Sequence, residues 1–143
     1  MCNPVTVIHP DALLEKGTHL GYEWEVTSNR IGYRCGYIRV PHGHPWHGKN
    51  YDEVDAEVHG GLTFAAADLN CGKGGADDAW WLGFDCAHFG DAPDPSLPGN
   101  LPGQLRLLAG TIRTTEYVAG ECRRLIDQAV LPMYVVRLVE IAG

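Results

Sequence analysis

The 143-residue chain contains no run of basic residues, and its formal net charge is −7. Nucleic-acid binding needs clustered Lys and Arg to neutralise phosphates, so we do not expect a nucleic-acid partner. No apolar stretch approaches the ~20 residues that span a bilayer. The opening MCNPVTVIHPD also lacks the basic and apolar regions of a secretory signal. We therefore expect no membrane association and a cytoplasmic location.

Several motifs of metal and phosphate sites are missing as well. The five cysteines are odd in number, widely spread and never arranged as CxxC, which argues against a disulfide framework and a zinc ribbon. No HEXXH sequence occurs, and GKGG lacks the Ser or Thr and the first glycine spacing of a phosphate loop. Any metal or ligand site must therefore be assembled from dispersed residues.

Glycine and proline, in contrast, are abundant, with 18 and 9 copies. They indicate many turns, which favours strands over a helical bundle. The length fits one domain, residues 1–143, and the apolar share of 45% suffices for a core. We predict an α+β fold, a mostly antiparallel β-sheet with one main C-terminal amphipathic helix packed on it.

Hydrophobic periodicity predicts the individual elements. Alternating or apolar runs predict strands at 5–9, 22–26, 33–40, 54–59, 62–66, 79–88 and 134–142. A polar, glycine-rich excursion is expected at 68–78 and a long, proline-rich surface loop at 89–103. The Gly60–Gly61 break predicts either a second hairpin of 54–59 with 62–66 or a β-bulge. Residues 11–17 are expected to form one or two helical turns with Asp11 as cap and Gly17 as stop. A helical stripe predicts the main helix at 114–130, ended by Pro132.

Four of the seven histidines fall in PHGHPWHGKNYDEVDAEVHGG, residues 41–61. His42 and His44 have the spacing of strand neighbours, but Gly43 and Pro45 disfavour regular strand geometry there. The HxH spacing is therefore a weak metal signal, and we expect His42 and His47 to be plain surface residues.

A distributed set of residues is the better candidate site. His59, Asp85 and His88 close predicted strands, and His44 lies on the intervening loop. An Asp beside a His fixes its tautomer, which serves metal ligation or general-base catalysis. This predicts a metal set of His44, His59, Asp85 and His88, with zinc as the ion. A ligand pocket would add Gly60 and Gly61, where a ligand can approach the backbone, and Trp81 for stacking on a flat group; Gly83 and Trp46 would help similarly.

A purely structural role is the alternative for this set. Asp85 would accept backbone or indole hydrogen bonds, and His59 and His88 would lie at a solvent-exposed edge. Cys86 is expected to be buried and inert, although a Cys86–His88 nucleophile pair is conceivable. Tyr117 and Glu121 are expected to face solvent.

Three stretches, DEVDAEVHGGLTFA, WWLGFDCAHFGD and TTEYVAGECRRLIDQ, resemble a group of small uncharacterised phage- and prophage-encoded proteins. In that group a strand ending in HGGLT precedes a WWFGFDCAH-like strand and an E-Y-V-x-x-E-C helix. GHPWHGK resembles the group's G-H-P-x-x-G-K, and the similarity covers residues 31 to 129. The resemblance implies an accessory role in an infected or lysogenic bacterium, and it includes all the predicted ligand-binding residues.

Three functions follow as hypotheses. The first is a phage-type accessory protein that binds a small polar, nucleotide-like ligand and acts against a host pathway. The second is a zinc-dependent hydrolase in which a carboxylate deprotonates a metal-bound water. The third is an interaction module whose acidic face meets a basic host protein; that face comprises Glu23, Glu25, Asp52, Glu53, Asp55 and Glu57.

Overall fold

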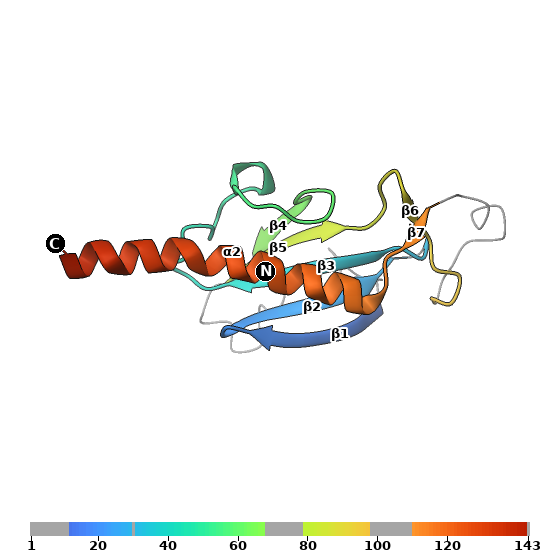
Figure 1. Ribbon diagram of the computed structural model, residues 1–143, viewed down its shortest axis with the longest axis horizontal. Coiled ribbons are helices and arrows are strands. Elements are labelled where there is room, and N and C mark those ends of the chain that lie inside the picture. Colours follow the sequence, from blue (N-terminus) through green and yellow to red (C-terminus); the bar gives the residue numbers. More distant parts are fainter. Residues whose placement is uncertain (1–11, 30, 68–78, 98–109, 143) are drawn as a thin grey trace.

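A computed structural model describes residues 12–29, 31–67, 79–97 and 110–142, with side chains as far as Met133. One helix lies across one face of a five-stranded antiparallel sheet in the order β1-β2-β3-β5-β4 (Figure 1). The predicted α+β class is therefore confirmed. The elements are β1 (Ala12–His19), β2 (Tyr22–Ser28), β3 (Arg34–Val40), β4 (Phe64–Ala67), β5 (Trp80–Asp85) and α2 (Thr115–Ala142).

The β2–β3 hairpin matches the sequence prediction. Trp24 and Val26 are buried on the face that meets α2, and Trp24 pairs with Ile38 across the ladder. The connection is organised by Asn29, whose side-chain oxygen accepts hydrogen bonds from three successive backbone N–H groups. Period-2 alternation identified Tyr22–Val26 because Trp24 and Val26 face the core while Glu23 and Glu25 do not; β3 is buried on both faces.

The predicted helical turns at 11–17 are wrong, because β1 occupies Ala12–His19. β1 pairs with β2 through a two-residue turn, in which Leu20 and Gly21 have φ of 52° and 84°. Two positive φ values match the twist of a tight hairpin. Gly17 ends no helix; it lies under the Trp24 indole, and a Cβ there would be 2.7 Å from Trp24 Cζ2. Asp11 is outside the described residues.

Residues 54–59 form neither the predicted strand nor a hairpin with β4. The segment is extended but pairs with α2 instead of a strand: the Glu57 N–H donates to Gln128 Oε1 at 2.7 Å, and the Glu57 carbonyl accepts from Gln128 Nε2 at 2.7 Å. Val54 and Val58 are buried, as the alternation predicted. The strand predicted at 62–66 is present as β4, whose only ladder partner among the described strands is β5.

β5 is an interior strand that is buried on both faces. Leu82 and Phe84 join the core beneath α2, whereas Trp81 packs on the opposite face with Cys35 and Tyr37. The WWLGFD alternation predicted this division. After β5 the chain turns into β6 (Asp91–Ala92), which pairs in parallel with β7 (Thr111–Ile112) just before α2.

α2 begins one residue after the predicted start at Thr114 but continues to Ala142, so both the stop at Pro132 and the strand at 134–142 are wrong. The predicted apolar stripe is confirmed: Val118, Cys122, Leu125, Ile126 and Ala129 are fully buried. The last turns extend past the sheet (Figure 1), where a strand would lack a ladder partner and a helix satisfies its own backbone. A proline inside a helix costs one backbone hydrogen bond there.

Two predicted segments lie outside the described residues, the strand at 5–9 and the polar excursion at 68–78. The predicted loop at 89–103 is described only to Leu97, and it contains β6. Among the helices that the structure describes, none has the length and hydrophobicity of a bilayer-spanning segment.

Candidate functional site

Three side chains converge where the chain leaves β5. His59, His88 and Asp91 each present one ligand-type atom, and these atoms lie within 4.8 Å of one another. His59 Nε2 is 2.9 Å from Asp91 Oδ2, and His88 Nδ1 is 3.5 Å from the same oxygen. Two histidines and one carboxylate form a donor set for zinc or for a facial transition-metal site.

The chain turn after β5 brings His88 and Asp91 together. The His88 N–H donates to Asp91 Oδ2 at 3.0 Å, and the Asp91 N–H donates to the His88 carbonyl at 2.9 Å. His59 comes from the 54–59 segment, and its N–H donates to Glu121 Oε1 on α2 at 2.9 Å. Both the turn and the contact between the segment and α2 are therefore needed to assemble the group.

The outward-facing atoms of the three side chains also have partners. His59 Nδ1 lies 2.9 Å from the Tyr117 hydroxyl, and Asp91 Oδ1 accepts a hydrogen bond from Arg113 Nε at 2.8 Å. His88 Nε2 lies 3.5 Å from Asp85 Oδ1. Outer partners of this kind orient metal ligands and set histidine tautomers.

Asp91 is the electrostatic centre of the group. Its side chain is only 1% exposed. Burial by itself raises the pKa of Asp91, but hydrogen bonds from His59, Arg113 and the His88 N–H outweigh burial and lower the pKa to about 2. The carboxylate is consequently ionised at neutral pH, as a metal ligand must be.

His88 Nδ1 is buried and has no hydrogen-bond partner. Its 3.5 Å approach to Asp91 Oδ2 is an ion-pair distance without hydrogen-bond geometry. In the tautomer with a proton on Nε2, the Nδ1 lone pair faces a carboxylate oxygen, which is unfavourable. A cation between the two atoms, either a proton or a metal ion, removes that repulsion.

Arg34 fixes the backbone that carries Arg113. Its Nε donates to Thr115 Oγ1 at 2.9 Å, its Nη1 donates to the Arg113 carbonyl at 3.1 Å, and its Nη2 lies 3.0 Å from Asp94 Oδ2. Arg34 is buried, so these charge-assisted bonds lie in a poorly solvated environment. The network links β3 to the start of α2.

His44, which the sequence places in the metal set, is not part of the group. It is buried, its Nε2 lies 2.7 Å from the Ala129 carbonyl, and its Nδ1 accepts the Trp46 N–H at 2.9 Å. Burial lowers the pKa of His44, which favours the neutral ring. Ala129 and Tyr117 are separated by about 18 Å along α2 at 1.5 Å per residue, so His44 lies far from His59.

The other predicted residues fall into two groups. Asp85 lies beside His88 and accepts from Thr63 Oγ1 at 3.1 Å, so it is a neighbour of the three-residue group and not a member. Trp81 is fully buried on the sheet face opposite α2, which leaves no surface for a ligand to stack on.

The predicted glycines differ in what surrounds them. Gly60 lies against the His88 ring, and the space near Gly83 is filled by the Tyr37 ring, so neither leaves room for a ligand. Gly61 has positive φ and open space beside it. His42 and His47 are in ring contact with each other, the first exposed and the second half-buried.

Cys86 lies in the core, and burial raises the pKa of its thiol well above the ordinary value. A protonated thiol is a poor nucleophile, so a Cys86–His88 nucleophile pair is disfavoured.

Asp91, Arg113 and Tyr117 were not predicted as site residues. Asp91 follows His88 by three residues, a spacing that a turn brings together. Tyr117, Glu121, Arg124 and Gln128 form a polar stripe at helical spacing, and three of them bind the 54–59 segment. That stripe was the available signal, but a polar stripe usually indicates a solvated face.

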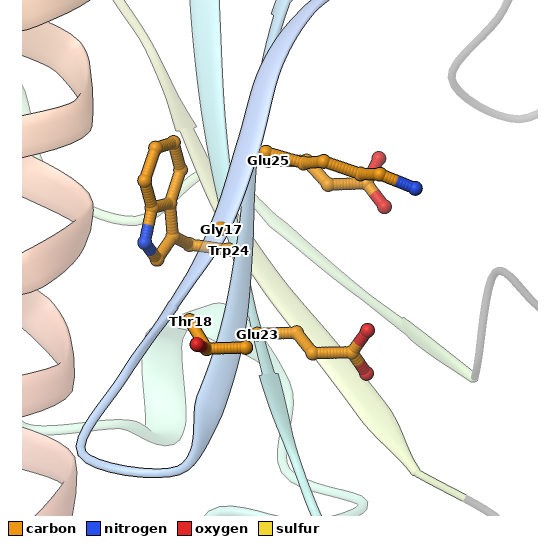
Figure 2. Close-up of a pocket in the computed structure, with 6 residues that line it drawn as sticks. Gly17, Thr18, Glu23, Trp24 and Glu25 are labelled. Atoms are coloured by element: carbon orange, nitrogen blue, oxygen red, sulfur yellow. The ribbon is translucent and has the colours of Figure 1, made fainter.

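A separate pocket of about 250 Å³ lies at the β1–β2 hairpin, and none of the predicted ligand-binding residues lines it. Figure 2 shows the Trp24 indole on the α2 side of the hairpin, with the Glu23 and Glu25 carboxylates on the other side. The remaining lining residues are Lys16, Gly17 and Thr18.

Comparisons with protein-family models, with curated proteins and with solved structures found no match for this chain. The resemblance to phage-encoded proteins and the implied host partner therefore stay predictions.

Proposed function

We propose that this protein binds a divalent transition metal ion, zinc first among the candidates, through His59 Nε2, His88 Nδ1 and one oxygen of Asp91. The observation that carries the proposal is how the inner and outer atoms of these three side chains are arranged. Three ligand atoms lie within 4.8 Å of one another, while the opposite atom of each side chain faces Tyr117, Asp85 or Arg113.

The distances suit such an ion. Ligands bound at about 2.0–2.1 Å in a tetrahedron lie roughly 3.3 Å from one another. The 2.9 Å and 3.5 Å separations from Asp91 Oδ2 bracket that value. Metal binding would displace the proton shared by His59 and Asp91 and leave His59 Nδ1–H to donate to the Tyr117 oxygen.

Three protein ligands leave coordination positions open, as in catalytic zinc sites and non-haem iron sites. A water or a small polar ligand fits there. We thus keep the small polar ligand predicted from the sequence, but as a molecule bound to the metal. His44 and Trp81 are not among the residues around it. Hydrolysis by an activated water is the enzymatic form of the same proposal.

Metal content tests the proposal directly. Protein made without an affinity tag, stripped with a chelator and dialysed against Zn²⁺ is expected to retain about one equivalent. His59→Ala and His88→Ala are expected to retain less than ~0.2 equivalents, since a lost ligand weakens an ordinary zinc site strongly. His19→Ala is the matched control, because His19 also faces a carboxylate, Asp127. Folded wild-type protein that retains no transition metal would refute the proposal.

A metal-free proton relay is the second candidate. It is favoured by one observation, that the His59 ring is bound at both nitrogens, by Asp91 and by the Tyr117 hydroxyl. Tyr117 would pass its proton to His59, and Asp91 would stabilise the imidazolium. Burial, and then Glu121, raise the pKa of Tyr117, which opposes that transfer and ranks the relay second. If chelator-treated protein retains a catalytic activity and Tyr117→Phe abolishes it, that result would favour the relay over the metal.

A further inference from the structure

Arg113 presents unused hydrogen-bond donors beside the proposed metal. Its Nε donates to Asp91 Oδ1 at 2.8 Å, and its guanidinium carbon lies 5.1 Å from the centre of the Tyr117 ring. Within the described part of the chain, its two terminal amino groups make no hydrogen bond, and its ion pair is the one with Asp91. Its side chain is 27% exposed, so a ligand from solvent can reach those amino groups.

The guanidinium is held in one orientation. Asp91 binds one side of it, and the Tyr117 ring lies against its face. The Arg113 carbonyl is fixed by Arg34, which is itself bound to Asp94 and Thr115. A pre-oriented guanidinium loses less side-chain entropy on binding a ligand than a mobile one does.

Charge then selects the kind of ligand. A bound dication and Arg113 together carry more positive charge than Asp91 and Asp85 can neutralise. His59 and His88 would add no charge as metal ligands, since they bind as neutral imidazoles. The open coordination positions therefore lie in a locally positive site, although the net charge of the chain is −7.

We infer that the ligand of this site is a phosphate group, free or as an ester, with one oxygen on the metal and others on the terminal amino groups of Arg113. The planar guanidinium fork matches phosphate oxygens in pairs, and a metal with open positions takes a further oxygen. The inference rests on the proposed metal site, and it narrows the small polar ligand to an oxyanion of tetrahedral shape.

Calorimetric titration of the zinc-loaded protein with inorganic phosphate tests the inference, with acetate as the planar anion. We expect phosphate to bind, acetate to bind at least tenfold more weakly, and Arg113→Gln to weaken phosphate binding tenfold or more. Arg113→Lys should recover part of the loss because it keeps the charge. Arg39→Gln is the control, since Arg39 also pairs with a carboxylate, that of Glu23 at 3.0 Å.

Zinc content is measured on every sample, so the two proposals fail in different ways. Wild-type protein that holds zinc but binds no phosphate overturns the inference and leaves the metal proposal standing. Acetate binding as tight as phosphate binding, or phosphate binding unchanged in both Arg113 variants, also overturns it. Wild-type protein without zinc refutes both. If Arg113→Gln loses zinc, Arg113→Lys with full zinc content is used in its place. Phosphate binding to Arg113→Lys as tight as to the wild type would then overturn the inference.

Discussion

The His88 imidazole lies directly on Gly60: a Cβ at Gly60 would stand 2.1 Å from His88 Cε1 and 2.5 Å from Nδ1. Gly60 was expected to let a ligand approach the backbone, but the space beside it is occupied by the His88 ring of the same site. His88 keeps its position because residue 60 has no side chain, and His59, the neighbour of Gly60, is thereby brought beside His88.

Gly60→Ala and Gly61→Ala form a matched pair. Both glycines have positive φ, 69° and 83°, so backbone strain alone should cost either alanine variant roughly 1 kcal/mol of stability. Only at position 60 does the new methyl group meet His88. We therefore expect zinc retention to fall in Gly60→Ala and to persist in Gly61→Ala. Equal zinc content in the two variants would contradict this placement of His88.

Asp85→Asn tests the outer partner of His88. Asn keeps the size of Asp85 but removes the charge that faces His88 Nε2 at 3.5 Å. Loss of such a partner costs roughly 10–100-fold in metal affinity. Competition with a zinc-binding dye gives the dissociation constants. Asp55→Asn, at an exposed position, should change nothing; an unchanged affinity in Asp85→Asn would remove Asp85 from the site.

The depressed pKa of Asp91 predicts acid sensitivity of the metal-free protein. A carboxyl group whose pKa falls from 3.8 to about 2 on folding stabilises the native state above pH ~4 and loses that contribution as pH falls to 2. The shift corresponds to a contribution on the order of 2 kcal/mol. Urea unfolding between pH 6 and 2 should show the wild-type and Asp91→Asn stabilities converging at the acid end.

Against the effect of burial, hydrogen bonds from Ser96 and Arg34 also lower the pKa of Asp94, so the informative quantity is the difference in stability between the two proteins. A carbon-detected NMR titration of the Asp91 carboxyl gives a direct check. A midpoint near the ordinary value would show that His59 and Arg113 do not hold the carboxylate as the structure has it.

His44→Ala should separate stability from metal binding. The change leaves the Ala129 carbonyl and the Trp46 N–H without their partner and opens space in the core, which is expected to cost about 2–4 kcal/mol. Zinc retention of the remaining folded protein should equal that of the wild type. Thermal unfolding and metal content measure the two effects, and a loss of zinc would return His44 to the metal set.

The sequence by itself determined those elements whose buried face can be recognised from the spacing of their own apolar residues. Alternation in 22–26 and 79–88 predicted the hairpin strand β2 and the two-faced strand β5, and the stripe from Val118 to Ala129 predicted the buried face of α2. Such periodicity is local, since it reflects which side chains of one segment face the core.

Tertiary structure alone decided what each segment pairs with. The extended 54–59 segment pairs with Gln128 and not with a strand, while Ala12–His19 becomes a strand because a tight turn returns it to β2. The site obeys the same rule. His59 meets Asp91 from 32 positions away and Tyr117 from 58. Periodicity carries no information about such separations, because they depend on how loops close over the assembled sheet.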